Sequence, residues 1–245
     1  ILVTFAAIFA IIVITISLFD WNMLKPYIER QVTEKTGREF IIRGDLDVNL
    51  FFNPKISVEG LSLANADWGT GQPMLDIEKL SFRIYPWKLF WGEIVLPELS
   101  ISQPKILLEK SLDGKRNWVL KEEEKETELP KIGKLIVDQG TLIFRDPKTE
   151  TDITARIATD SASTDARETP INIVAEGKFT SLKFTFQVHG GEVISLMDKS
   201  RAYPVQGNVQ IGTTHATFDG TITGLQALSA MDLKLEVRGD DLSAL

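Results

Sequence analysis

The sequence predicts a mainly β protein that begins with a membrane-spanning helix and a short amphipathic helix. Three observations carry this prediction. Residues 1–19 contain no charged residue, proline or glycine, residues 20–37 repeat apolar side chains four positions apart, and from residue 38 onward apolar and polar residues alternate in short runs. A spacing of three or four residues marks one face of an α-helix, whereas a spacing of two marks one face of a β-strand. We therefore expect an anchor at 1–19, a helix at 20–37 and a sheet domain at 38–245.

The first segment has the length of a bilayer-spanning helix. At ~1.5 Å per residue, "ILVTFAAIFAIIVITISLF" would extend ~28 Å, close to the ~30 Å hydrocarbon thickness of a bilayer. A cleaved signal peptide is the alternative, but its apolar region is usually shorter and ends in a small-x-small cleavage site, which "SLFDW" does not contain. We expect an uncleaved, single-pass anchor.

The second segment carries start and stop signals of a short helix. Asn22 is a capping residue type, Pro26 falls in the first turn, and Gly37 follows the last turn. One face of this helix holds Leu24, Ile28 and Val32. Because the other face is charged, we expect the apolar face to pack on the end of the sheet.

The third segment shows only the period of two. In "TGREFIIRGDLDVNLFFNPKISVEG" (36–60) the even positions from 40 to 52 are free of polar side chains, which predicts one strand. Later runs show the same alternation and are separated by Gly, Pro, Asn and Asp residues typical of turns. We expect one long antiparallel sheet. Near residues 121–128, "KEEEKETE" has nothing to bury, which predicts a mobile, solvated loop within the sheet domain.

Composition argues against several classes of function. The net charge is −7 and no cluster of Lys and Arg occurs, so we predict no nucleic-acid surface. The chain has no cysteine and only two histidines, His189 and His215, so carboxylates would have to complete any zinc site. Nucleophile-elbow, phosphate-loop and zinc-protease motifs are missing from the sequence. We predict neither enzymatic activity nor a metal or cofactor.

Two further polar patterns are interpreted as structural. Asp45 and Asp47 share the odd face of the first strand, and paired carboxylates can act as acid and base, but that face is the polar one and we expect it to be solvated. Arg-Gly-Asp occurs at 43–45 and at 238–240. A glycine between strand residues serves as a bulge or a bend, so we do not interpret either copy as an adhesion motif.

Several short motifs follow one another in a defined order along the chain. Asp20-Trp21-Asn22 leads through "LKPYIERQVTEKTGREFIIRGDL" to "FNPKISVEGLSLANADWG", which contains the turn Asp67-Trp68-Gly69 and is followed by Met74 and Leu75. Further on, "QPKILLEKSLDGKRNW" ends in Asn117 and Trp118, and "LEVRGDDLSAL" contains the pattern Gly-x-Asp-Leu-x-x-Leu. Each motif alone is unspecific, but in this order, which covers nearly the whole chain, they resemble the N-terminal region of the AsmA family of bacterial envelope proteins.

The resemblance implies a protein anchored in the inner membrane by one helix, with its β domain in the periplasm. It implies a long, strongly curved sheet related to bridge-like lipid transfer proteins, whose hydrophobic groove transports phospholipids between the inner and outer membranes. Family members are usually much longer, so we interpret the chain as the N-terminal part of a longer protein. A second hypothesis is an envelope assembly or scaffold factor that supports outer-membrane protein insertion by binding outer-membrane or periplasmic proteins, for example by strand addition at a sheet edge.

The apolar faces of the first predicted strands are the candidate lipid-binding surface. Apolar surface must be covered, either by this chain or by a ligand. Acyl chains on such a face would regain ~0.8 kcal/mol per methylene. The candidate residues are Phe40, Ile42, Leu46, Val48, Leu50, Ile56, Val58, Leu80, Phe82 and Ile84. A closed β-sandwich, in which the same residues pack on one another, is the alternative.

Overall fold

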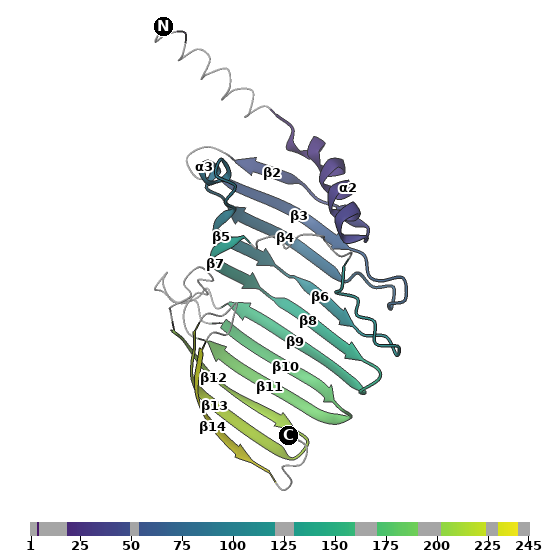
Figure 1. Cartoon of the computed structure of the whole chain (residues 1–245), viewed down its shortest axis with the longest axis vertical. Coiled ribbons are helices and arrows are strands. Elements are labelled where there is room, and N and C mark those ends of the chain that lie inside the picture. The colour runs from purple at the N-terminus through teal and green to yellow at the C-terminus, as the bar shows by residue number, and fades with distance from the viewer. Residues whose placement is uncertain are drawn as a thin grey trace.

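The computed structural model of the chain describes Thr4 and residues 19–49, 54–120, 130–159, 171–190, 202–223 and 230–239. Its strands form one long sheet that is not closed, with helices beside its first strands (Figure 1). The predicted anchor, except for Thr4 and Phe19, and the charged loop near 121–128 lie outside the described residues. In the described part of the chain, no helix has the length and apolar character needed to cross a bilayer.

The prediction of a mainly β fold is confirmed. The strands are β1 (Phe40–Ile42), β2 (Leu46–Asn49), β3 (Lys55–Leu63), β4 (Leu75–Arg83), β5 (Val95–Ser102), β6 (Lys105–Glu109), β7 (Lys131–Asp138), β8 (Gly140–Asp146), β9 (Thr151–Thr159), β10 (Ile171–Phe179), β11 (Leu182–Gly190), β12 (Ala202–Ile211), β13 (Thr214–Thr223) and β14 (Ala230–Arg238). The order across the sheet is β1-β3-β4-β6-β8-β9-β10-β11-β12-β13-β14; β2 also pairs with β3, and β5 with β4 and β7. These described strands belong to a single sheet, so they do not form the alternative two-sheet sandwich.

The predicted helix at 20–37 is present as two consecutive elements, η1 (Trp21–Leu24) and α2 (Lys25–Thr36). Pro26 lies in the first turn of α2, as expected. Gly37 follows α2 with φ of +67°, and its N–H donates to the carbonyl oxygen of Thr33 at 2.9 Å. Only glycine adopts this left-handed conformation without steric cost, so the predicted stop signal is confirmed.

The predicted cap is wrong. Asp20 caps η1, because its Oδ1 accepts the backbone N–H of Asn22 at 3.0 Å. Asn22 lies inside η1 and its side chain has another role, since its Oδ1 accepts the N–H of Leu46 in β2 at 3.0 Å. Sequence alone could not separate these two residues, because Asp and Asn have similar capping preferences.

Side chains of the helical segment also accept hydrogen bonds from backbone N–H groups at the outer edge of the sheet. Three strand N–H groups donate to them: Phe40 to Thr33 Oγ1 (3.0 Å), Ile42 to Glu29 Oε1 (2.8 Å) and Leu46 to Asn22 Oδ1 (3.0 Å). An edge strand with unpaired N–H groups is a template for unwanted pairing. These bonds hold the helical segment against β1 and β2 and occupy three N–H groups that an added strand would need.

The first alternating run forms two strands, not the one that was predicted. Between the pairs Ile42–Leu61 and Leu46–Val58, three residues of the first run face two of β3, which is a β-bulge. The bulge contains the first Arg-Gly-Asp, so the structural interpretation of that tripeptide is confirmed. A Cβ on Gly44 would lie only 2.6 Å from Glu59 Cβ.

We expect Gly44→Ala to lower the free energy of unfolding by about 1–3 kcal/mol, because the added methyl group cannot fit without shifting β3. Urea denaturation measures this change. Gly190→Ala is the matched control, since its Cβ would meet nothing closer than 3.9 Å. The bulge account fails if the two variants are equally stable.

The sheet is mixed, so the prediction of an antiparallel sheet is wrong at one step. β5 pairs in parallel with β7, and β6 in parallel with β8. The difference in residue number between paired residues is the same in both parallel pairings. Against β4, the pairing of β6 continues the register of β5. The two pairs are therefore two long strands, each broken once, at Gln103 and at Gln139, which have φ of +48° and +51°. A parallel pair needs a long crossover, which alternation within strands cannot reveal.

Candidate functional site

One row of apolar side chains crosses the entire described sheet. Residues that pair directly across neighbouring strands point to the same face. From β1 to β14 the paired residues are Phe40, Leu63, Leu75, Ile106, Leu142, Ala155, Ala175, Phe186, Val209, Ala216 and Val237. We call this row the apolar ladder. All eleven residues are buried or half-buried.

The adjacent row faces the other side of the sheet and is mostly polar. Its members are Ile41, Ser62, Asp76, Lys105, Thr141, Arg156, Val174, Gln187, Asn208, Thr217 and Glu236. From β11 to β14 its side chains are exposed. The register thus sorts the sheet into an apolar and a polar face over its whole described length.

Two shorter apolar rows run beside the ladder across the first strands. They are Leu46, Val58, Leu80, Ile101 and Val137, and next to them Val48, Ile56, Phe82, Leu99 and Leu135. Within one strand, a residue of these two rows and a residue on the side of the ladder are an odd number of positions apart, as Val58 and Leu61 are. In a regular strand that spacing would place them on opposite faces. Gly60, Gln103 and Gln139 stand at the breaks with φ of +66°, +48° and +51°. These left-handed residues interrupt the alternation in β3 and at the two strand breaks, and in β4 it is interrupted at Glu78 and Lys79, which are both exposed. Both sides can therefore stay on one face.

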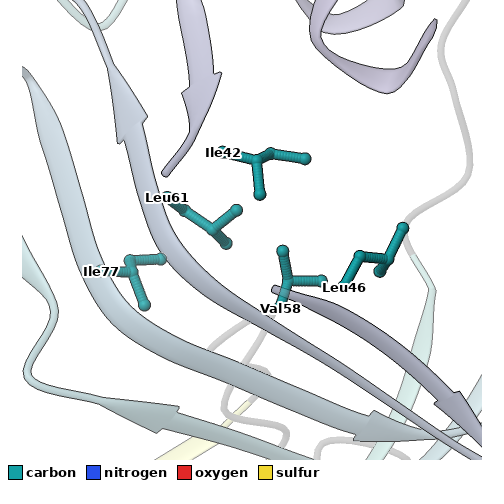
Figure 2. Packing of buried hydrophobic residues seen from close by; sticks show 5 residues of the cluster. All are labelled: Ile42, Leu46, Val58, Leu61 and Ile77. Atoms are coloured by element: carbon teal, nitrogen blue, oxygen red, sulfur yellow. The ribbon is translucent and has the colours of Figure 1, made fainter. Parts of the chain in front are cut away.

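The rows meet the helical segment at an apolar pocket of about 420 Å³. Its lining is Trp21, Leu24, Ile28, Val32, Phe40, Ile42, Leu46, Val48, Ile56, Val58, Leu61, Leu80 and Phe82. Every one of these described lining residues is apolar. Figure 2 shows the side chains of Ile42, Leu46, Val58 and Leu61 directed toward a common space between these strands.

Eight of the ten predicted lipid-binding residues line this pocket. Leu50 lies outside the described residues, and Ile84 lies beyond the end of β4, where its N–H donates to the carbonyl of Pro54 at 3.1 Å. That the eight bind lipid stays a prediction. Leu24, Ile28 and Val32 face the sheet as expected. Trp21 and Leu61 were missed, because Trp21 precedes the helical period and Leu61 is out of phase with Val58.

The pocket has a buried floor and accessible walls. Ile42, Leu46, Val58 and Leu61 are 4–8% exposed, whereas the other sheet residues of the lining are half-buried. At roughly 30 Å³ for a water molecule, and a similar volume for a methylene, the pocket could hold roughly fourteen methylenes of one acyl chain. Since its lining is apolar, binding there would be non-directional.

A buried polar cluster holds two loops and a strand together. Asn117 is fully buried: its Oδ1 accepts the N–H of Glu109 (2.9 Å), and its Nδ2 donates to Asn65 Oδ1 (2.9 Å) and to the carbonyl of Leu107 (2.8 Å). Glu109 Oε2 in turn accepts from Asn65 Nδ2 (2.7 Å) and from Thr70. Asn65 and Asn117 belong to the "NADWG" and "GKRNW" motifs. These motifs therefore have a structural role.

A second cavity of about 630 Å³ adjoins this cluster, lined in part by Trp68, Glu109 and Asp146. Its two cations are paired with carboxylates: Lys110 lies 2.7 Å from Asp146, and Arg145 lies 3.6 Å from Glu109. The lining also holds four carboxylates, Glu109, Asp146, Glu150 and Asp152, so the cavity has a net negative charge and repels an anionic ligand. The apolar pocket is the better candidate site.

The Lys110–Asp146 pair predicts an acid-dependent stability. The hydrogen bond from Lys110 holds the pKa of Asp146 below its usual value. Because the folded pKa lies below the unfolded one, this stabilisation is present above about pH 4 and is lost as the pH falls through the folded pKa. We expect Lys110→Met to flatten the fall in unfolding free energy below about pH 4, measured by urea denaturation. Lys148→Met controls for net charge, and identical pH profiles of the two variants would contradict the prediction.

Comparison with known proteins gives one consistent result. A family model described as "AsmA family" matches residues 1–193. The "AsmA family protein YhjG" of Escherichia coli (strain K12) is 22% identical over 277 residues, which cover 98% of this chain and 40% of that protein. The chain thus spans about two fifths of the length of this curated relative. No solved structure matches the chain.

Proposed function

The chain belongs to the AsmA family, and from this premise we propose that it carries phospholipids along the apolar face of its sheet, as one section of a route between the inner and outer membranes. In this proposal the anchor at residues 1–19 holds the protein in the inner membrane and the sheet lies in the periplasm. Family membership suggests a role in envelope lipid transport or assembly. The transport of phospholipid is the finer proposal.

The apolar ladder is the observation that supports this proposal most directly. It continues without a polar residue over eleven strands, from the pocket beside α2 to β14. At ~4.8 Å between strands, such a row extends about 50 Å. In a protein whose apolar side chains served only its own packing, a second layer would be expected over this face. All fourteen described strands instead belong to one open sheet.

Energetics explain why no catalytic group is needed. A diacyl lipid that leaves a bilayer exposes roughly 30 methylenes at ~0.8 kcal/mol each, so its barrier is of order 20 kcal/mol in water. A continuous apolar face would replace most of the lost contacts at every step. The headgroup would stay in water, so we expect the acyl chains of the lipid to contribute more to binding than the headgroup.

The alternative of an assembly factor that binds proteins by strand addition has less support at the first edge of the sheet. There, side chains of η1 and α2 already accept N–H groups of β1 and β2. A partner strand would have to displace them. The length of the row and the relative's greater length favour a section of a conduit over a complete one.

Photocrosslinking on opposite faces of one strand tests the proposal. A photoreactive amino acid is placed either at Val209, in the apolar ladder, or at Asn208, its neighbour in the polar row. After irradiation in cells, the purified protein is analysed by mass spectrometry. We expect crosslinked phospholipid with Val209 and none above background with Asn208, since the two side chains point to opposite faces.

Two other crosslinking results would count against lipid transport along the ladder. Equal crosslinking at the two positions would indicate non-specific lipid contact and contradict the proposal. A defined protein crosslinked at Val209, without lipid, would favour the assembly hypothesis.

A further inference from the structure

The segment between β4 and β5 exposes an unusual concentration of aromatic side chains. It contains the short helix α3 (Pro86–Leu89). The exposed residues are Tyr85 (39%), Trp87 (53%), Phe90 (88%), Trp91 (73%) and Ile94 (52%). We call residues 84–94 the aromatic loop. Its stacking is local, as the rings of Tyr85 and Trp87 lie 4.9 Å apart.

Exposure of this kind needs a partner to cover it. Large apolar side chains are stabilised when they are removed from water, and contiguous exposed apolar surface marks interaction sites. The residue types point to a lipid surface. Trp and Tyr concentrate at membrane–water interfaces, and Trp, Phe and Leu form the inserted face of interfacial segments.

The described charges around the aromatic loop fit the surface of an anionic membrane. Lys88 and Lys131 both approach Glu93, at 3.5 and 3.4 Å, and Arg83 lies 3.7 Å from Glu98. Lys55 in β3 lies directly opposite Arg83 in β4. These six groups sum to two net positive charges. A net positive charge close to a membrane with anionic lipids is attracted to its surface.

The position of the loop agrees with this partner. Figure 1 shows α3 and α2 at the same end of the molecule, beside the first strands of the sheet. Near the start of the described chain, Phe19, Met23 and Tyr27 are also exposed, at 41%, 71% and 56%, directly after the predicted anchor. The loop follows Phe82, which lines the apolar pocket. A bilayer that contacted the loop would therefore lie close to that pocket.

We propose that the aromatic loop inserts into the interface of the bilayer that holds the predicted anchor, as a second membrane contact. Phe90 and Trp91 reach below the headgroups, and Lys88 and Lys131 remain at the phosphate level. Two contacts fix the orientation of the sheet, which a single anchor leaves free to rotate. The apolar pocket is then held near the lipids. This contact depends on the anchor and does not require that lipid moves along the sheet.

A site-specific fluorophore tests the proposal in the full chain. Because the chain has no cysteine, Phe90→Cys gives a single attachment site for an environment-sensitive dye. Gln72→Cys is the matched control: Gln72 is also exposed, but it lies in the β3–β4 connection, at the other end of β4 from the aromatic loop. Both labelled proteins are reconstituted into vesicles of phosphatidylethanolamine and phosphatidylglycerol, with or without nitroxide-labelled acyl chains.

We expect the dye at position 90 to emit severalfold more strongly and to be quenched by the nitroxide lipids, whereas the dye at position 72 responds to neither. Replacing Trp87 and Trp91 with serine should reduce the quenching at position 90. Equal responses at the two positions would overturn the proposal. So would a dye signal at position 90 that rises with protein density and is not quenched by lipid, because that result assigns the loop to a second copy of the chain. A failure of lipid transport along the sheet would leave these readouts unchanged.

Discussion

Replacing Asn117 with alanine is expected to lower the free energy of unfolding by about 2–4 kcal/mol, more than the loss expected for Gly44→Ala. Asn117 is fully buried, and its side chain satisfies the N–H of Glu109, the carbonyl of Leu107 and the side chain of Asn65. Alanine leaves all three without that partner. A buried polar group that loses its hydrogen bond costs about 1–3 kcal/mol.

Urea denaturation of the full chain in detergent, followed by tryptophan fluorescence, measures this loss. Asn117→Asp is the informative companion: it keeps the shape, but it removes the two N–H donors and adds a charge close to Glu109, so it should be at least as damaging. Asn172→Ala, on an exposed strand position, should change stability by less than about 0.5 kcal/mol. A similarly small effect of Asn117→Ala would show that the two motifs are not joined by this cluster.

Replacing Val209 with aspartate is expected to reduce lipid transport about a hundredfold or more while the sheet stays folded. Val209 stands in the apolar ladder between Phe186 and Ala216 and is half-buried. A carboxylate there would meet acyl chains, and a charge in an apolar environment costs at least several kcal/mol. Since about 1.4 kcal/mol changes a rate tenfold, one such position should block passage.

Transfer of fluorescent phospholipid between vesicles by the longest available form of the protein measures this loss. Asn208→Asp is the control, because it adds the same charge to the same strand on the polar face. Thermal melting of both variants separates blocked passage from unfolding, and we expect Val209→Asp to cost only about 1–2 kcal/mol of stability at a half-exposed site. Equal transfer by the two variants would contradict a lipid path along the ladder.

Individual residues show how far sequence reasoning could reach. The stop at Gly37 and the apolar stripe Leu24–Ile28–Val32 follow from local rules, because a left-handed glycine and a helical period act within a few residues. Alternation within each early strand also identifies its apolar residues, because it depends only on neighbouring positions. Eight of the ten predicted lipid-binding residues line one pocket for that reason. The error at the Asn22 cap arose because Asp and Asn have similar capping preferences. The first strand was left undivided because a bulge shows only in the pairing with β3.

The sequence by itself determined the class of the fold, the presence of a short helix before the sheet and which side of each strand is apolar, because these depend on the spacing of side chains within one segment. Tertiary structure alone decided the parallel step at β5–β8, the breaks at Gly60, Gln103 and Gln139, and the register that joins Phe40 to Val237. Register depends on hydrogen bonds between segments that are far apart in the chain. A shift of one residue would turn each strand's apolar side to the opposite face, so pairing, and not alternation, makes the apolar face continuous.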